Sequence, residues 1–574
     1  MKYISSNLFK TIIMTCFVAG ITACNKDLGH YNYTEINTVK IDAVNNVTAA
    51  VGSTLEIVPT LTFSLGEDES IFSFTWYVKQ DTGWVALQQS RNLEIEVSGL
   101  IGTPTEANPY SMAYEVINNK TQVAYRKLFS LTVINPLTRG YTALCEHDND
   151  FDIDMLVLSP ENNFSLYKNI LNLTGSAIPR ENVKPYDIMA CNDNMAPDPY
   201  NRDGVTYSVY ILTDQYTTHI KALDYSWQPS YDISNTVERN SYLDKEFVQQ
   251  GKKIIAQQMK YAYMVTGSLL YNRIFLYNKE DNGQGNWYVC SNYPAWYFYS
   301  QPMNDVRPSG NARYEPAPFI SGNSNGAMYF NADTKSFMYQ VFPSASGLGT
   351  TDLFYTQPLI NEPDGASFNF SDSNNGLLYM DERLGNSLSS DAGYAILKEA
   401  DGSFNYIEFG YSSSIAGMVA NTNKKRACIF PAGSSIGNAK FFASDPRVNS
   451  PFLFYATNDN KVYRADISSA TASVVDITSS ILAGDGYSEI TVFKFTLPNT
   501  SSIGGGLERA LAVGTYNSSL GKAEGGKLDF FTMADATTGV LALAKYPSDA
   551  PDGQGQTMSW KGLGRIVGLT YKEK

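Results

Sequence analysis

The stretch Phe452-Leu453-Phe454-Tyr455-Ala456-Thr457-Asn458-Asp459-Asn460-Lys461-Val462-Tyr463-Arg464-Ala465-Asp466 has the pattern of a β-hairpin. Two runs rich in aromatic and β-branched residues flank a polar turn, which is typical of antiparallel strands joined by a short loop. Comparable runs, most of them followed by a second run after a polar turn, recur to the C-terminus at a spacing of roughly 50 to 75 residues. The seven units begin near Tyr141-Thr142-Ala143-Leu144, Val205-Thr206-Tyr207-Ser208, Tyr261-Ala262-Tyr263-Met264, Ala327-Met328-Tyr329-Phe330, Leu377-Leu378-Tyr379-Met380, Phe452-Leu453-Phe454-Tyr455 and Ala510-Leu511-Ala512-Val513.

Seven small antiparallel sheets in succession predict a β-propeller with seven blades over residues 136–574. Radial stacking of such sheets leaves only short edges open to other chains. The last strand-like run, Arg565-Ile566-Val567-Gly568-Leu569-Thr570-Tyr571, is expected to close the ring beside the first unit. A pair of β-sandwiches and an irregular β-solenoid remain as alternatives.

Strand-like runs also fill residues 38–135, and several of them alternate apolar and polar residues as half-buried strands do. About 100 residues of such strands predict an immunoglobulin-like β-sandwich. Trp76 is expected to fill the core between its sheets, the alternative being an exposed, ligand-binding Trp. The sequence therefore predicts an all-β chain in which a sandwich precedes a propeller, with a junction near Pro136-Leu137-Thr138-Arg139-Gly140.

The segment over residues 38–135 resembles the PKD-like domain of bacterial lipoproteins. The resemblance rests on Phe74-Thr75-Trp76-Tyr77-Val78, on the closing run Leu131-Thr132-Val133, and on the opening Cys24-Asn25-Lys26-Asp27-Leu28-Gly29-His30-Tyr31-Asn32-Tyr33. That opening is similar to the start of PKD-like family lipoproteins, which accompany starch-utilisation-like uptake systems in the outer membrane. The resemblance implies a cell-surface accessory protein without catalytic residues, whose partners are an outer-membrane transporter and a substrate-binding lipoprotein.

The first 23 residues have the layout of an export signal. Lys2 and Lys10 precede an apolar stretch over residues 11–19, which is too short for the about 20 residues that span a bilayer. Ile21-Thr22-Ala23-Cys24 resembles the lipobox of bacterial lipoproteins, whose cysteine carries the lipid. We expect a mature chain lipidated at Cys24, a tether over residues 24–37 and a place on the outer membrane facing the cell surface. An ordinary cleavage site that includes a cysteine, and the periplasmic leaflet, are the alternatives.

The overall charge limits the partners. A formal net charge of −14 repels nucleic acid, so we expect no nucleic-acid partner. Besides Cys16 and Cys24, the chain has four widely spaced cysteines without a CxxC motif, which makes a zinc site improbable. These cysteines are Cys145, Cys191, Cys290 and Cys428. We expect most of them to be free thiols that are buried as small apolar side chains. An extracytoplasmic location would permit disulfides, and the sequence does not indicate which cysteines would form them.

One acidic run is a candidate metal site. Asp148, Asp150, Asp152 and Asp154 stand at alternate positions, and oxygen ligands in that pattern can surround a hard cation such as calcium. However, the glycine and the distal glutamate of a calcium loop are missing. The alternative is a strand whose acids share one solvated face. We expect no other cofactor.

One aromatic run is a candidate ligand platform. Trp287-Tyr288 precedes Asn292-Tyr293-Pro294-Ala295-Trp296-Tyr297-Phe298-Tyr299, and sugars stack their C–H faces on exposed Trp and Tyr rings. Pro294 favours a loop or a sheet edge over a central strand. The candidate contacts are Trp287, Tyr293, Trp296, Tyr297 and Tyr299. The alternative is that these rings fill the core of a blade.

Catalytic motifs are scarce. The chain has only three histidines and no HExxH motif, and its two GxSxG matches, around Ser324 and Ser435, lie in loop-like stretches. The sequence therefore favours a non-catalytic accessory protein that binds a glycan or glycopeptide for an uptake system. A hydrolase or lyase with acids on the propeller face, and a purely architectural spacer, are the alternatives.

Overall fold

The structure is a computed structural model of the chain, and it describes residues 35–572 with gaps. The gaps are residues 51, 67, 81–82, 98–108, 160–162, 193–206, 236–252, 267–268, 281, 292–296, 299–301, 307–311, 323–325, 342–356, 359–375, 384–391, 411–420, 446–449, 497–506, 508, 536 and 548–554. The expected signal peptide, Cys24 and most of the expected tether therefore lie outside the described residues. Within them, no helix is long and apolar enough to cross a membrane.

The chain divides into two compact units. The smaller comprises residues 1–48, 54–95 and 106–132, and the larger comprises residues 49–53, 96–105 and 133–574. The division falls inside the last strand of the smaller unit, a few residues before the junction expected from sequence.

The smaller unit is all β, as predicted. Its main sheet has the antiparallel order β2-β9-β8-β5-β6, and two further pairs, β1-β4 and β3-β7, complete the unit. The strands are β1 (Val39–Asp42), β2 (Val47–Ala50), β3 (Thr54–Ile57), β4 (Thr60–Phe63), β5 (Phe72–Gln80), β6 (Gly83–Gln88), β7 (Leu93–Glu96), β8 (Tyr110–Asn118) and β9 (Ala124–Ile134). Trp76 is fully buried, stacks on Tyr114 at 4.2 Å between ring centroids, and donates its indole N–H to the Ser90 carbonyl at 3.1 Å. The prediction that Trp76 fills the core is confirmed.

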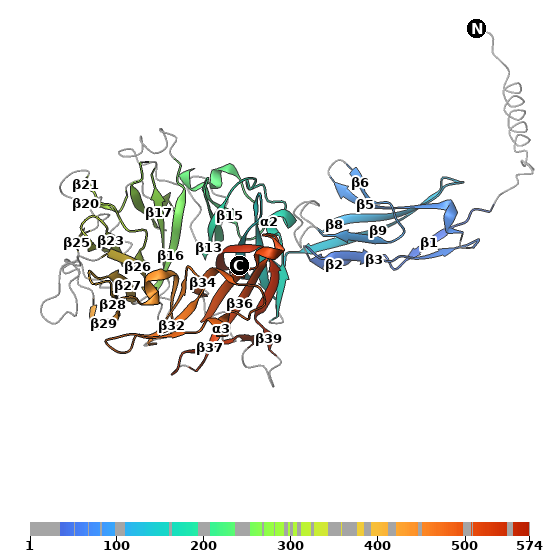
Figure 1. The fold of residues 1–574 in the computed structure, drawn as a ribbon. Helices are drawn as coiled ribbons and strands as arrows, with labels where there is room; N and C mark the ends of the chain where they lie inside the picture. Colours follow the sequence, from blue (N-terminus) through green and yellow to red (C-terminus); the bar gives the residue numbers. More distant parts are fainter. Residues whose placement is uncertain are drawn as a thin grey trace, which may run out of the picture. The chain divides into compact units, whose positions relative to one another are not determined.

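The larger unit is a β-propeller. In the described residues, seven sheets of three to five strands follow one another along the chain, and the strands of each sheet pair antiparallel (Figure 1). Two small antiparallel pairs, β20 (Asp305–Val306) with β21 (Ala312–Arg313) and β38 (Lys545–Tyr546) with β39 (Gln556–Thr557), are additional to these seven sheets. The first three blades contain β10 (Gly140–Glu146), β11 (Phe151–Leu158) and β12 (Phe164–Tyr167); β13 (Pro185–Asn192), β14 (Tyr207–Thr213) and β15 (Thr217–Lys221); and β16 (Ala256–Thr266), β17 (Leu269–Lys279), β18 (Gly285–Ser291) and β19 (Tyr297–Phe298). The last four contain β22 (Ser321–Gly322), β23 (Gly326–Asn331), β24 (Ser336–Val341) and β25 (Gln357–Pro358); β26 (Gly376–Arg383), β27 (Ala392–Lys398), β28 (Phe404–Gly410) and β29 (Asn421–Phe430); β30 (Ala439–Ser444), β31 (Phe452–Thr457), β32 (Val462–Asp466) and β33 (Ser473–Asp476); and β34 (Glu489–Thr496), β35 (Ala510–Tyr516), β36 (Gly526–Asp535) and β37 (Val540–Leu543), with β40 (Ser559–Leu563) paired to β36.

The hairpin quoted first forms the two middle strands of the sixth blade. Thr457 closes its turn, because its N–H donates to the Lys461 carbonyl at 2.9 Å and Asn460 adopts a left-handed φ of 59°. All six residues of β31 are buried, although a half-buried strand would bury only every second residue. The reason is that a middle strand of a blade is covered on both faces by neighbouring blades, which explains its continuous run of apolar residues.

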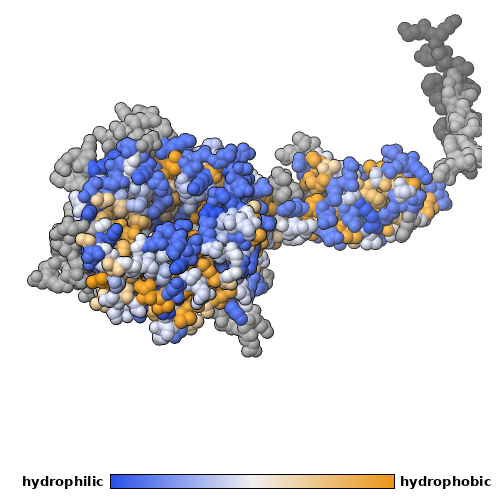
Figure 2. Space-filling model, in the orientation of Figure 1, coloured by the Kyte–Doolittle hydropathy of each residue, from blue (hydrophilic) through white to orange (hydrophobic). Residues whose placement is uncertain are grey.

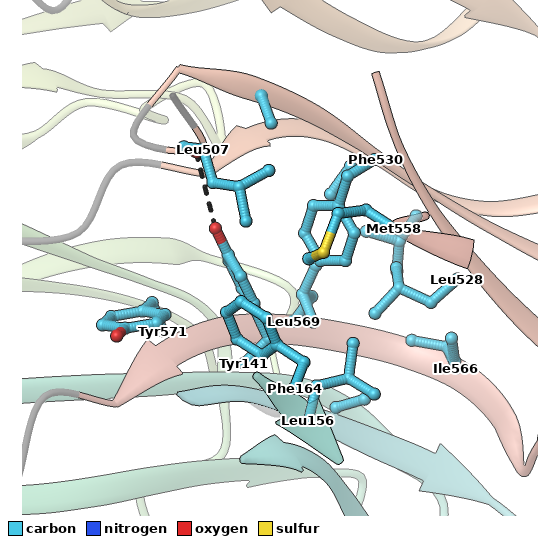
Figure 3. Packing of buried hydrophobic residues seen from close by; sticks show 14 of the residues in the cluster. Tyr141, Leu156, Phe164, Leu507, Leu528, Phe530, Met558, Ile566, Leu569 and Tyr571 are labelled. Atoms are coloured by element: carbon cyan, nitrogen blue, oxygen red, sulfur yellow. Dashed lines mark hydrogen bonds between the residues drawn. The ribbon is translucent and has the colours of Figure 1, made fainter. Parts of the chain in front are cut away.

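The last strand closes the ring, as predicted. β41 (Arg565–Lys572) pairs antiparallel with β10 and places Tyr571 opposite Tyr141. Figure 3 shows Tyr141, Leu156 and Phe164 packed with Leu569 and Phe530, so the first and last blades share one hydrophobic core. The Tyr141 hydroxyl donates to the Leu507 carbonyl at 3.5 Å within that core.

Helices are short, and the described cysteines are buried. The two α-helices among the described residues are α2 (Ile170–Leu173) and α3 (Thr478–Ile481). Cys145, Cys191 and Cys428 are free and buried, which confirms the expectation for these three, whereas the side chain of Cys290 lies outside the description.

Candidate functional site

A cavity of about 540 Å³ lies at the centre of the propeller. Its wall is formed by β13, β16, β26, β30, β34 and β41 together with the loop before β22, so all seven blades contribute to it. These strands each stand at one end of their sheet, which is the position nearest the propeller axis. The ring therefore brings residues that are distant in sequence into one cavity.

Charged and aromatic side chains dominate the wall of this central cavity. The charged residues are Asp187, Lys260, Asp381, Glu382, Lys440 and Lys494. The rings include Tyr186, Phe319, Tyr379, Phe441, Phe442 and Phe495. Figure 2 shows that the outer surface facing the viewer is mainly hydrophilic, with smaller hydrophobic patches on the larger unit.

An ion pair joins the third and fifth blades across this cavity. The Lys260 ammonium on β16 contacts the Asp381 carboxylate on β26 and donates to the Ile320 carbonyl at 2.9 Å. The Tyr379 hydroxyl donates to the other Asp381 oxygen at 2.7 Å. The Asp381 carboxylate is thus fixed by two side chains, and Lys260 spans three blades because Ile320 precedes β22.

Burial shifts the pKa values of this cluster. Burial lowers the pKa of Lys260, but the Asp381 carboxylate opposes this effect and the net pKa of Lys260 is raised. Burial raises the pKa of Glu382 to about 7, which Lys260 opposes and Asp381 reinforces. Glu382 therefore changes charge near neutral pH, whereas Lys260 stays protonated.

The opposite part of the wall carries two further lysines. Lys440 on β30 lies 4.8 Å above the Phe441 ring and 3.5 Å from the Ile490 carbonyl. Lys494 on β34 acts on Asp187 of β13, where it opposes the rise in the pKa of Asp187 that burial causes. Gly568 on β41 lets this region pack closely, since a Cβ there would lie 2.7 Å from the Asp187 Oδ1 atom and 2.8 Å from the Ile188 nitrogen.

The four predicted calcium ligands do not come together. Asp152 is buried and pairs with Arg180 at 2.6 Å, while Asp154 accepts the Gly564 N–H at 2.8 Å and the Asn169 N–H at 2.9 Å. Asp150 pairs instead with His147 at 3.1 Å, and Asp148 is exposed. In the described part of the chain, no group of three or more His, Cys, Asp or Glu residues could hold a metal ion. Asp152 binds the start of α2 and Asp154 binds the loop at Gly564, so the oxygen atoms of both acids accept hydrogen bonds from the protein itself, although Asp150 and Asp152 line one small pocket.

The aromatic run is only partly described. Trp287 is fully buried and donates its indole N–H to the Ala317 carbonyl at 3.0 Å, so the structure places it in the core between blades and not on an exposed platform. Tyr293, Trp296 and Tyr299 lie outside the described residues, and Tyr297 begins β19 with its side chain outside the description. The expected platform therefore stays a prediction for these four.

Sequence reasoning missed the central cavity. Most of the missed charges sit in the first strand of their unit between apolar neighbours, as in Met259-Lys260-Tyr261 and Phe493-Lys494-Phe495, whereas Asp381 and Glu382 adjoin each other. A charge inside a strand that must be covered on both faces needs a polar opening. That pattern could have identified these positions, but it could not have shown that they face one cavity.

The chain is similar to several known proteins. A model of the PKD-like family matches residues 24–179. Among curated proteins, none matches this chain. A quinoprotein alcohol dehydrogenase-like protein from Bacteroides thetaiotaomicron is 9% identical, with a TM-score of 0.41, over 94% of this chain and 100% of that chain.

Two further solved structures are similar at lower TM-scores. Apo AztD from Citrobacter koseri is 9% identical over 87% of this chain and 98% of that one, with a TM-score of 0.29. A lectin from Aleuria aurantia, in complex with α-methyl-L-fucoside, is 12% identical over 64% of this chain and 97% of that one, with a TM-score of 0.29. The propeller assignment rests on the seven sheets and the closing strand of this chain.

Proposed function

We propose that this protein is a lipid-anchored accessory protein of the cell surface, which binds a glycan or glycopeptide in its central cavity for an outer-membrane uptake system. The observation that carries the binding role is the cavity of about 540 Å³, to which all seven blades contribute. This volume lies within the about 300–1,000 Å³ of small-molecule sites.

The chemistry of the cavity wall suits a sugar. Rings such as Tyr379, Phe441 and Phe442 offer flat apolar faces for sugar C–H groups. Nearby Lys260, Asp381 and Glu382 offer donors and acceptors for hydroxyl groups. Apolar faces combined with a few placed polar groups are what an oligosaccharide needs, because it presents both kinds of surface.

The cell-surface assignment rests on the N-terminal sequence. Ile21-Thr22-Ala23-Cys24 has the layout of a lipobox, and the match to the PKD-like family model begins at residue 24, where the mature chain would start. An outer-membrane transporter and a substrate-binding lipoprotein are the partners that we propose. Replacing Cys24 with Ala tests the anchor, and protease shaving of intact cells tests which membrane face holds the protein.

The hydrolase or lyase alternative has one observation in its favour, the adjacent carboxyl groups of Asp381 and Glu382 with unlike surroundings. A glycosidase needs two carboxyl groups about 5–10 Å apart on either side of one bond, and adjacent residues of one strand do not flank a bond in this way. Asp381 is also held by Lys260 and Tyr379. We therefore favour binding without catalysis.

A glycan array probed with the full chain tests the proposal. Glycans that bind are then titrated calorimetrically against Phe441→Ala, which changes the cavity wall, and Leu520→Ala, an exposed site outside the cavity. We expect the first variant to weaken binding about tenfold, since a stacked ring contributes about 1–2 kcal/mol, and the second to bind like the parent. Equal binding by both variants would place the ligand elsewhere, and new reducing ends released from a bound glycan would establish catalysis instead.

A further inference from the structure

We propose that the ligand of the central cavity is an acidic oligosaccharide, whose carboxylate or sulfate groups are bound by Lys440 and Lys494. This inference rests on the proposed function, because it specifies the class of ligand that the same cavity takes.

The first observation is that only one of the three lysines in the cavity wall forms an ion pair with a described residue. Lys260 is neutralised by Asp381, and its ammonium also donates to a backbone carbonyl. Over the described ranges of the chain, the ion pairs of this wall involve Lys260 and neither Lys440 nor Lys494. Among the residues that the structure describes, these two lysines therefore form no ion pair, although Lys494 interacts electrostatically with Asp187.

Several other lysines of the same propeller have carboxylate partners, although the buried Lys572 donates to the Leu137 carbonyl instead. Lys522 pairs with Glu146 at 2.8 Å, and Lys527 pairs with Asp529 at 2.9 Å. The chain has 57 acidic and 43 basic residues, so carboxylates are the more abundant partners. Lys440 contacts a backbone carbonyl and the Phe441 ring, and Lys494 influences Asp187 electrostatically, so neither charge has, in the described residues, an ion pair that an anionic ligand would have to break.

The spacing of the two lysines favours more than one negative charge on the ligand. The Lys440 ammonium lies at the Ile490 carbonyl of β34, and Lys494 stands four residues further along that strand. At about 3.3 Å per residue, four residues span about 13 Å. An oligosaccharide with acidic groups on successive sugars is long enough to follow this strand and meet both lysines.

The rings beside these lysines give the sugar a surface to lie on. Phe441 carries the Lys440 ammonium over its ring, and Phe495 follows Lys494 in the cavity wall. In such a pair, the ring can stack on the apolar face of a sugar while the ammonium binds the acidic group of the same sugar. The net charge of −14 would repel an acidic polymer elsewhere, so local cations are needed to hold it.

Isothermal titration calorimetry with the full chain tests this inference. The probes are trigalacturonic acid, its neutral methyl ester, galacturonic acid as a monomer, and a sulfated galactose oligosaccharide with its desulfated form. The variants are Lys440→Met, Lys494→Met and their arginine counterparts. Lys461→Met is the matched control, because this exposed lysine lies outside the cavity and its loss changes the net charge equally.

We expect an acidic trimer to bind at least tenfold more tightly than its neutral form and than the monomer. Each methionine variant should weaken that binding about tenfold, as for a charge-assisted hydrogen bond, while the arginine variants and Lys461→Met stay within about threefold of the parent. Tighter binding of the sulfated than of the carboxylated probe, or the reverse, identifies the source of the anion.

Three results would overturn the inference. If neutral and acidic forms bind equally well, the anion site is wrong while the proposed glycan-binding function stands. If an acidic probe binds but both methionine variants bind it like Lys461→Met, the anion is held elsewhere. If neither acidic probe binds at millimolar concentration while the glycan array finds neutral ligands, the ligand class is wrong.

Discussion

Replacing Asp152 with Ala should destabilise the propeller by about 4 kcal/mol. Asp152 is 2% exposed and accepts four hydrogen bonds. They come from the backbone N–H groups of Ile153 and Leu171 at 2.7 Å, from that of Asn172 at 3.2 Å, and from the Arg180 guanidinium at 2.6 Å. Two of these donors belong to α2, whose cap Asn169 makes no side-chain capping bond.

The size of this loss of stability follows from the groups that lose their partner when Asp152 is replaced. The first N–H groups of a helix need acceptors, and Asp152 supplies them to α2 from a neighbouring strand. Removing one partner of a buried ion pair costs about 3–5 kcal/mol, because the remaining charge is uncompensated. Burial also raises the pKa of Asp152, because an ionised carboxylate is unfavourable away from water. The charge of Arg180 and the backbone N–H groups oppose this effect and stabilise the ionised form.

Equilibrium urea unfolding of the full chain, followed by tryptophan fluorescence, measures the effect. Asp148→Ala is the control, because this exposed residue of the same acidic run should change stability by less than about 0.5 kcal/mol. The double change Asp152→Ala with Arg180→Ala should cost at least about 1.5 kcal/mol less than the sum of the single changes, since it also removes the stranded cation. A loss below about 1 kcal/mol for Asp152→Ala, or strict additivity, would refute this reasoning.

Deleting residues 564–574 should abolish the cooperative melt of the propeller in calorimetry, because β41 supplies the strand that pairs with β10; a deletion variant that melts like the parent would contradict ring closure. Burial lowers the pKa of Lys572 to about 7, whereas a lysine in the unfolded chain has a pKa of about 10.4. Between about pH 7 and 10 the unfolded chain therefore binds one more proton than the folded protein. The free energy of unfolding should rise with pH in this range, by up to about 1.4 kcal/mol per pH unit. That slope should be smaller in Lys572→Met, which pH-dependent urea unfolding measures; equal slopes would show that Lys572 is not its source. Cys24→Ala should release the protein from membranes or leave it unprocessed, as fractionation and immunoblotting will show, and normal processing with retention in membranes would exclude the lipobox. Trp296→Ala should weaken glycan binding roughly tenfold with little change in melting temperature if Trp296 is a stacking platform, whereas a large fall in melting temperature would identify it as a core residue.

Most of the architecture was accessible from local sequence patterns. The hairpin around Asn460 could be predicted because aromatic runs and a polar turn are local signals. The closing strand could be predicted because residues 565–571 form a strand-like run that a ring of blades can pair with its first unit. The smaller unit and the burial of Trp76 followed from alternation in the same way.

The candidate site was less accessible, for a geometric reason. Lys260 and Asp381 meet across more than 100 residues, and nothing in either local sequence specifies the partner. The regular spacing of acids at 148–154 was misleading, since residues two apart on a strand share a face but their surroundings decide what they bind. Here α2 and Arg180 contact Asp152, and the loop at Gly564 contacts Asp154.

The pairing of β41 with β10 has a consequence for how the protein is made. Asp154 and Gly564, which this closure brings together, are 410 residues apart in the chain. Joining the ends of a loop of that length costs about 5 kcal/mol of chain entropy, and it cannot occur before the final strand has been synthesised. The nascent propeller must therefore wait with an open first blade, whose buried residues stay exposed to water and to other chains. Until β41 pairs with it, the edge of β10 presents unpaired backbone groups that strands of other chains could bind.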